Sequence, residues 1–439
     1  MTAALAAAEA LRHAVTVAVA APLAMALVVG LLLLAGPRWL PEAVVSRLVT
    51  AGLVLSALAA ACAAILHVAF PGAVPGGNID YGDWLAVGSY SVPIVALVDG
   101  LALAFSLLAA TLTALVARFS QTYLHREAGF ARFYVLLGMF AGGAQLVAFA
   151  GALDVLFAGW ELIGIASALF IGFFHEREEP VRSSLRAFAT YRLCDVGLLI
   201  AIVSAHEVLG STRLSALGGA GALPFPEAET LALLFLVAAM GKSAQLPFSG
   251  WLPRAMEGPT PSSALFYGAI SIHAGLYLML RVSAVIDVAP VAAGAGVVVG
   301  VATALYAAAV ARVHTDAKGA LAHATLSQIG LILAEICLGL TTLAVVHLVC
   351  HALLRAYQYL RAPNMLHDVH QHGHFEHGRM PLAGVAPRFA ARTYSAAVHR
   401  LRLDERIDAA IRPVLRLSRA LARLDDRVSG ITDHGPRPG

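Results

Sequence analysis

Two lysines are the first residues in this chain whose type and position suggest chemistry. Of its 30 lysine and arginine residues, only Lys242 and Lys318 are lysines, and both lie in or beside long apolar runs. Arginine keeps its proton, whereas a buried lysine can release it. We therefore expect Lys242 to take up and release a proton. The alternative, that the side chain reaches up to the membrane surface, applies most readily to Lys318, which is nearer the end of its run.

A glutamate on a different apolar run is the expected counterpart of Lys242. Glu161 stands in FAGWELIGIASALFIGFF, where no neighbouring residue is positive. It needs a partner from another helix or a bound proton. A glutamate and a lysine on different helices can be coupled in proton transfer, which makes Glu161 and Lys242 the predicted central pair. A fixed structural ion pair is the alternative.

Arg192 and Asp195 lie three residues apart in YRLCDVGLL, a spacing that places both on one helix face. Such a pair either adjusts the proton affinity of Glu161 and Lys242 or only lowers the free-energy cost of inserting its own helix into the membrane. Both interpretations stay open.

Histidines continue the pattern on a later run. His347, His351 and Arg355 fall at i, i+4 and i+8 in HLVCHALLRAYQYLRAP, and His273 lies in another apolar run. Histidine titrates near neutral pH. The spacing predicts a polar stripe that carries protons or water, although a lone buried histidine can also be a simple hydrogen-bonding residue.

Other polar residues are assigned lesser roles. Asp99, Asp154, Arg281 and Glu335 also fall in or near apolar runs, and Asp154 and Arg281 are expected at helix ends. The four cysteines, Cys62, Cys194, Cys337 and Cys350, are expected to be buried packing residues. The histidines of HDVHQHGHFEHG match no zinc spacing, so we interpret this segment as a solvated loop. The residues are His367, His370, His372, His374 and His377.

These side chains require a membrane scaffold to position them. Hydrophobic residues make up 59% of the 439 residues, charged residues 13%, and the mean hydropathy is +0.77. Apolar runs of about 20 residues are long enough to cross a bilayer as helices. The pattern excludes a soluble domain and predicts an all-α, polytopic integral membrane helical bundle of about eleven spans, within a range of ten to twelve. The expected spans are 14–35, 46–70, 93–117, 132–151, 153–174, 186–205, 228–246, 261–284, 289–312, 319–340 and 341–361.

Composition divides the chain further. GKSAQLPFSGWLPRAMEGPTPSS contains four prolines and predicts a discontinuous helix near 242–261. Residues 1–365 form the expected transmembrane domain, 366–394 a His-rich linker, and 395–439 a basic amphipathic tail. From Arg379 onward twelve arginines face six acidic residues. Positively charged residues next to membrane spans favour the cytoplasmic side, which predicts a cytoplasmic C-terminus.

No phosphate loop, dinucleotide fingerprint, haem-attachment motif or iron–sulfur cysteine spacing is present. We therefore expect no cofactor, no metal, no catalytic residue and no nucleic-acid partner, only membrane lipid and a transported proton or Na⁺.

Four segments resemble the antiporter-like subunits of respiratory complex I, chiefly the subunit L type, a family that includes Mrp-type antiporter subunits. They are GWELIGIASALFIGFF, GKSAQLPFSGWLPRAMEGPTPSSAL, TDAKGALAHATLSQIG and HLVCHALLRAYQYL. The resemblance implies that Glu161 and Lys242 act as a coupled pair. It also implies that Lys318, His347 and His351 belong to the proton path.

The chain departs from the family pattern at several places. Arg355 stands at a usual lysine, and Tyr267 at a usual histidine, with His273 two turns on. The later helix with a GFFSKDE-like motif is missing from the sequence. This shortened form, with its YLRAPNMLHD ending, resembles the membrane subunit of bacterial DAB-type inorganic carbon transporters.

The resemblance implies a cation-conducting subunit of a bicarbonate or CO₂ transporter in the bacterial inner membrane. It also implies a large cytoplasmic zinc partner that resembles β-carbonic anhydrases. One alternative is a proton-translocating subunit of an NADH-quinone oxidoreductase or a related redox complex. The other is an Mrp-type sodium/proton antiporter subunit. On each of these readings the chain is a transport subunit rather than an enzyme by itself.

Overall fold

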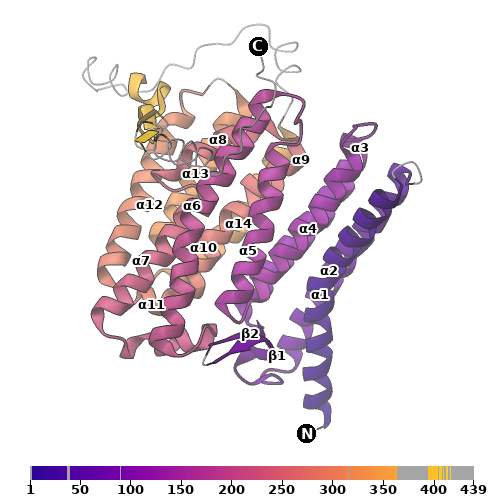
Figure 1. The fold of residues 1–439 in the computed structure, drawn as a ribbon, viewed down its shortest axis with the longest axis vertical. Helices are drawn as coiled ribbons and strands as arrows, with labels where there is room; N and C mark the ends of the chain where they lie inside the picture. The colour runs from indigo at the N-terminus through magenta and orange to yellow at the C-terminus, as the bar shows by residue number, and fades with distance from the viewer. Residues whose placement is uncertain are drawn as a thin grey trace, which may run out of the picture. The chain divides into compact units, whose positions relative to one another are not determined.

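The computed structural model describes residues 2–36, 40–88, 90–314, 316–362 and part of 394–416 (Figure 1). The chain divides into two units, Met1–His377 and Gly378–Gly439. The predicted linker 366–394 lies outside the described residues except for Tyr394, and so does most of the tail 395–439. Its described part contains a 3₁₀ turn at Arg400–Arg402. The linker and the amphipathic tail therefore stay predictions.

Within the described residues, ten helices are long and apolar enough to cross a membrane, which confirms the predicted helical membrane fold. They are α1 (Thr2–Ala35), α2 (Glu42–Ala69), α3 (Gly100–Tyr123), α4 (Phe130–Phe149), α5 (Leu153–Ile171), α6 (Glu178–Leu209), the run Thr260–Arg281, α12 (Pro290–Ala311), α13 (Ala317–Cys337) and α14 (Thr341–Arg361).

One further helix, α7 (Phe225–Lys242), packs against α6, α10 and α12 but carries three charged residues in its 18. α7 is therefore not among the ten candidate spans of the described residues.

A two-stranded hairpin precedes α3. Strands β1 (Asn78–Val87) and β2 (Tyr90–Leu97) pair antiparallel. The expected start of the third span at residue 93 is wrong, because residues 93–97 belong to β2. The β-branched residues Val92, Ile94 and Val95 favour a strand there, and Asp99 then caps α3 by accepting a hydrogen bond from the Ala102 N–H at 2.8 Å.

The proline-rich segment interrupts the helical path, as predicted. After α7 ends at Lys242, the chain forms only short turns and the four-residue helices α8 (Trp251–Arg254) and α9 (Thr260–Ser263). A π-helical turn, Ala264–Ala269, follows and leads into α10 (Ser271–Arg281) and α11 (Ser283–Ile286). Single π turns inside helices are often found at functional sites, and this one contains Tyr267.

Glycines end α13 and allow it to pack closely against α12. Gly339, at φ +78°, ends α13 in the left-handed region, so the nearly continuous apolar run 319–361 becomes two helices. Earlier in α13, a Cβ added at Gly330 would lie 2.5 Å from the Gly300 carbonyl oxygen of α12. The two helices therefore pack with their backbones in close approach.

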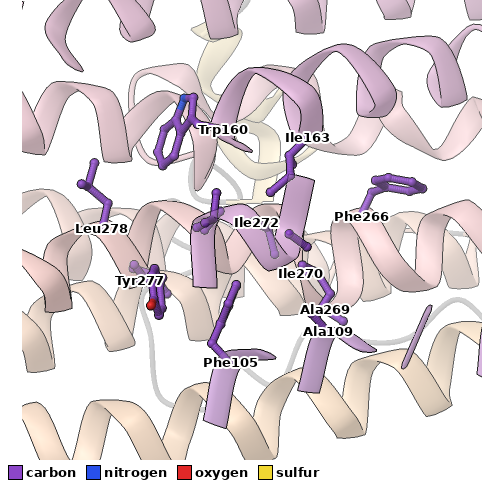
Figure 2. Packing of buried hydrophobic residues seen from close by; sticks show 14 of the residues in the cluster. Phe105, Ala109, Trp160, Ile163, Phe266, Ala269, Ile270, Ile272, Tyr277 and Leu278 are labelled. Carbon is purple, nitrogen blue, oxygen red and sulfur yellow. The ribbon is translucent and has the colours of Figure 1, made fainter. Parts of the chain in front are cut away.

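Apolar side chains fill the interior. Figure 2 shows Trp160 and Ile163 of α5, Ile272 and Tyr277 of α10, and Phe105 of α3 within one buried cluster. Of the cysteines, Cys194 and Cys337 are buried as expected, and all four are free. The same expectation is wrong for Cys62 and Cys350, which are exposed on the outward faces of α2 and α14.

The two ends of the bundle differ in charge. One end, which we call the arginine-rich end, is formed by the α3–α4, α5–α6 and α12–α13 connections and by the last turn of α14. The other, the hairpin end, carries β1 and β2 (Figure 1). Described lysines and arginines at the arginine-rich end are Arg47, Arg118, Arg126, Arg132, Arg177, Arg182, Arg186, Arg254, Arg312, Lys318 and Arg361. At the hairpin end they are Arg12, Arg213 and Arg281.

Candidate functional site

Lys242 is the last residue of α7 and is 1% exposed. Its Nζ donates a hydrogen bond to the Trp160 carbonyl oxygen at 2.9 Å. It also lies 4.8 Å from the centroid of the Trp160 ring and 5.1 Å from that of Tyr191. Among the described residues, no carboxylate comes within ion-pairing distance of Nζ. A buried ammonium group is thus held by a carbonyl oxygen and two aromatic faces rather than by a counter-ion.

The carboxylates near Lys242 are paired with Arg192 instead. Arg192 of α6 donates to Glu161 of α5 in a close ion pair, and its Nη2 lies 2.8 Å from Asp195 Oδ2. Asp195 Oδ1 also accepts a hydrogen bond from Trp160 Nε1 at 2.5 Å. The structure therefore brings together Glu161, Arg192, Asp195 and Lys242, which we call the Lys242 cluster. The direct partner of Glu161 is Arg192, which the sequence could not single out.

A glycine makes room for this cluster. A Cβ added at Gly164 would lie 2.9 Å from Lys242 Nζ and 3.4 Å from Arg192 Nη2. Gly164 follows Glu161 by one helical turn in α5, so it opens the face of the helix that both cations approach. Sequence reasoning missed Gly164, and its one signal was its place three residues after Glu161.

A second group of polar side chains lies between α10 and α14. His273 Nε2 and His351 Nδ1 are 3.0 Å apart, and Arg355 Nε donates to His351 Nε2 at 3.2 Å. Because Arg355 is a donor only, His351 Nε2 must accept, and Nδ1–H then donates to His273. These three buried residues form the His351 cluster, in which Arg355 sets the direction of the hydrogen bonds.

His347 takes its partners from α13. Its Nδ1 lies 2.9 Å from Glu335 Oε1 and its Nε2 lies 3.0 Å from Gln328 Oε1. The His347 and His351 ring centroids are 6.2 Å apart. The predicted polar stripe on α14 is thus present, and each of its members has a partner on a different helix or one turn away.

Hydroxyl groups line the elements between these clusters. Tyr267 donates to the Ser167 carbonyl oxygen at 3.4 Å, and the Ser167 and Ser271 hydroxyls are 3.2 Å apart. Ser243, next to Lys242, donates to the Ile272 carbonyl oxygen at 2.7 Å. These groups give α5, α7 and α10 polar contacts through an otherwise apolar layer.

Lys318 stands apart from both clusters. It lies in the first turn of α13 at the arginine-rich end and is partly buried, within electrostatic reach of Asp316 and Glu257. No hydrogen bond joins it to a described residue of the Lys242 or His351 cluster.

The remaining charged candidates have structural partners. Arg281, with 5% of its side chain exposed, makes two hydrogen bonds to Asp99, at 2.6 and 3.0 Å. Asp99 is therefore the cap of α3 rather than a group inside the membrane. Asp154, in the first turn of α5, accepts hydrogen bonds from Thr212 and from Tyr90 of the hairpin. Both sites hold the hairpin end together.

No group of three or more His, Cys, Asp or Glu side chains within the described part of the chain has the arrangement of a metal site. The His-rich segment 366–394 lies outside that part.

Two family descriptions match the chain. "NADH:quinone oxidoreductase/Mrp antiporter, TM" matches residues 150–384, and "NADH-Ubiquinone oxidoreductase (complex I), chain 5 N-terminus" matches residues 84–134. The first covers more than half of the chain and includes the Lys242 and His351 clusters.

Curated proteins and a solved structure agree with these matches. NAD(P)H-quinone oxidoreductase subunit 5 of the Adiantum capillus-veneris chloroplast is 35% identical over 293 residues, which cover 65% of this chain and 40% of the relative. NADH-quinone oxidoreductase subunit L of Pseudomonas aeruginosa is 33% identical over 337 residues, 76% of this chain and 55% of the relative. The Mrp complex from Dietzia sp. superposes with a TM-score of 0.68 at 30% identity, over 79% of this chain and 37% of that one. The chain thus spans about two-fifths to just over half of the length of these proteins.

Proposed function

Because this chain belongs to the NADH:quinone oxidoreductase/Mrp antiporter family of membrane proteins, we propose that it is a proton-conducting subunit of a multi-subunit membrane complex. One observation carries the proposal: among the residues that the structure describes, buried Lys242 has no ion-pair partner, while the two carboxylates beside it are shared with Arg192. Such a lysine can gain and lose a proton within a network that responds to its charge.

The charges of the Lys242 cluster suggest how conduction works. With Lys242 protonated, two cations balance the carboxylates of Glu161 and Asp195. When Lys242 gives up its proton, the cluster carries one net negative charge, which attracts the next proton. We assign Glu161 as the acceptor of that proton, because its Oε1 atom is buried and has no hydrogen-bond partner among the described residues. Proton transfer along the bundle would then pass to the His351 cluster through the hydroxyls of Ser271 and Tyr267.

The charge of the two ends supports an orientation. Eleven of the described lysines and arginines flank the arginine-rich end, against three at the hairpin end. Positive residues favour the cytoplasmic side, so we propose that the arginine-rich end, and with it the end of α14, faces the cytoplasm of a bacterial cell.

The nature of the complex is a finer proposal. The relatives named above are subunits of quinone oxidoreductases and of an Mrp complex, and these two classes fit the chain better than an inorganic carbon transporter does. None of them is described as a carbon transporter, so the expected zinc-containing partner rests on the YLRAPNMLHD resemblance alone.

Reconstitution into vesicles tests the proposal. With an imposed membrane potential, the purified chain in its native complex is expected to move protons, and Lys242→Ala is expected to abolish the flux. Lys242→Arg, which keeps the charge but not the labile proton, is expected to fail as well. Arg312→Gln, at the arginine-rich end, is the control. A flux carried by Na⁺ at constant pH would contradict proton conduction and favour the Mrp-type alternative.

Purification in mild detergent tests the complex. Quinone-site or iron–sulfur subunits, several antiporter-like subunits, or one large soluble zinc protein would each assign the chain to a different assembly. Recovery of the zinc protein alone would contradict the redox and Mrp assignments.

A further inference from the structure

Two histidines outside the clusters described above stack at the arginine-rich end. His314 lies in the connection between α12 and α13, and His323 lies in the second turn of α13. Their ring centroids are 4.6 Å apart and the ring planes are tilted by 31°. His323 lies within the TDAKGALAHATLSQIG segment, but its spacing from His314 predicts no contact, because the pair forms only when the connection folds back over α13.

Hydrogen bonds identify the Nδ1 atom of each ring as a donor. His314 Nδ1 lies 3.1 Å from Asp316 Oδ2, and His323 Nδ1 lies 2.9 Å from the Gly319 carbonyl oxygen. A carboxylate and a carbonyl oxygen only accept, so both Nδ1 atoms are donors. Nε2 is then the second nitrogen of each ring, beside an Nδ1 that already donates. Asp316 stabilises positive charge on His314 and also caps α13 through the Gly319 N–H at 2.6 Å.

The arrangement depends on Gly319. A Cβ added there would lie 2.6 Å from His314 Nδ1 and 2.5 Å from Asp316 Oδ2. Only glycine leaves His314 and Asp316 room to lie over the first turn of α13.

Exposure falls steadily from the surface inward through these residues. The side chain of Asp316 is 35% exposed, that of His314 is 14% exposed, and His323 is fully buried. Beyond His323, in α13 and α14, Thr325 and Tyr359 are also fully buried. Tyr359 lies one helical turn after Arg355 on α14. Buried hydroxyl groups therefore extend from this end of α13 toward the His351 cluster.

The elements packed against this end of α13 contribute further titratable groups. They are Tyr306 and Arg312 from α12 and its C-cap, Arg254 from α8, Glu257 from the turn Ala255–Glu257, Tyr359 and Arg361 from α14, and Lys318 on α13 itself.

We propose that Asp316, His314 and His323 form a proton port that connects the arginine-rich end with the His351 cluster. This inference rests on the proposed proton conduction and adds the place where protons enter or leave. A proton binds His314 at Nε2, with Asp316 balancing the charge, and moves through a bridging water to Nε2 of His323, which leaves His314 neutral again. Because two imidazolium rings 4.6 Å apart repel each other, the pair carries one extra proton at a time.

Proton flux in vesicles tests the port on the chain in its native complex. His314→Gln and His323→Gln are each expected to lower the flux by about tenfold or more, because glutamine keeps a hydrogen-bonding group but cannot carry a proton. His206→Gln is the matched control: this partly buried histidine makes an edge-on contact with Tyr90 at the hairpin end, and its substitution is expected to leave the flux unchanged.

Rescue separates proton transfer from a merely structural role. Imidazole added on the side of the arginine-rich end is expected to restore flux in His314→Gly, because it can occupy the vacated space and carry the proton. Imidazole added on the hairpin side is expected to have no effect. Failure of rescue from either side would overturn the role of His314 as a carrier.

The outcomes distinguish this inference from the function on which it rests. If the wild type conducts, Lys242→Ala does not, and both glutamine variants stay within about twofold of the wild type, the port is overturned and the proposed function stands. If the wild type itself moves no protons, both are overturned.

Discussion

Lys242 Nζ lies 2.9 Å from the carbonyl oxygen of Trp160, in the helix that carries Glu161, and not beside Glu161 itself. The two residues of the predicted central pair are therefore joined indirectly, through Trp160 and Arg192. A lysine held by a backbone carbonyl can lose its proton without leaving a buried carboxylate unpaired, which a direct ion pair would not allow.

The space left by Gly164 is the first target for mutation. Gly164→Ala would place a methyl carbon 2.9 Å from Lys242 Nζ, so we expect a fall in proton flux of about tenfold or more, measured in vesicles. The fold should survive, because alanine favours helix by about 1 kcal/mol over glycine. Gly294→Ala in α12, where an added Cβ meets nothing within 4 Å, is the control. Equal flux in the two variants would show that this space has no role in conduction.

Arg355 is expected to act through His351. Arg355→Met removes the donor to His351 Nε2 and releases the direction of the His351–His273 hydrogen bond, so flux should fall by about tenfold or more. Arg355→Lys, which keeps a charged donor, should retain most of the flux. Arg361→Met, on the same helix and in contact with Tyr357, is the control. If Arg355→Lys lost as much flux as Arg355→Met, a donor to His351 would not be the requirement.

Glu229 is expected to be structural although it is a buried carboxylate. It accepts hydrogen bonds from the N–H groups of Val291 and Ala292, both at 2.8 Å, and so caps the first turn of α12. Glu229→Gln should lower stability by about 1–3 kcal/mol and leave the flux per folded molecule unchanged. Thermal unfolding in detergent measures the first effect, with Glu227→Gln on the same helix as control. Loss of flux at normal stability would instead place Glu229 on the proton path.

The Asp99–Arg281 pair is expected to make stability depend on pH. Burial raises the pKa of Asp99, but the hydrogen bonds and charge of Arg281 outweigh it and hold that pKa below its usual value. The stabilisation is therefore fully present above the unfolded pKa of about 3.9 and is lost as pH falls through the lower folded value.

Asp99→Asn tests that pair. Removing the carboxylate leaves Arg281 buried without a counter-ion, so we expect the free energy of unfolding to fall by about 2–3 kcal/mol near neutral pH. The melting temperature of the variant should also decrease less than that of the wild type as the pH is lowered. Asp83→Asn, at an exposed position of the hairpin, is the control. An acid limb identical to that of the wild type would assign the pH dependence to other carboxylates.

Local features of the sequence predicted most of the scaffold. Runs of about 20 apolar residues located the helices, and the prolines after Lys242 located the break. The error at residues 93–97 arose because an apolar, β-branched run reads equally well as the start of a span. The use of arginine almost everywhere else made Lys242 conspicuous, and the spacing of Arg192 and Asp195 predicted their pairing.

What the sequence could not predict depends on contacts between distant residues. Arg192 meets Glu161 across 31 positions and Arg281 meets Asp99 across 182. The requirement for glycine at 164 and 319 appears only once a side chain from another segment is placed against it. His314 and His323 are nine residues apart in a stretch with no regular pattern, so their stacking has no local signal.

Trp160 links the charge of Lys242 to the backbone of α5. This one residue accepts from Lys242 through its backbone and donates to Asp195 through its indole ring, and it directly precedes Glu161. A change in the charge of Lys242 therefore strengthens or weakens a bond to the backbone of α5, the helix to which Glu161 is fixed. If the chain conducts protons as proposed, titration of Lys242 would change the force on α5, and a displacement of α5 would in turn change how strongly Lys242 holds its proton.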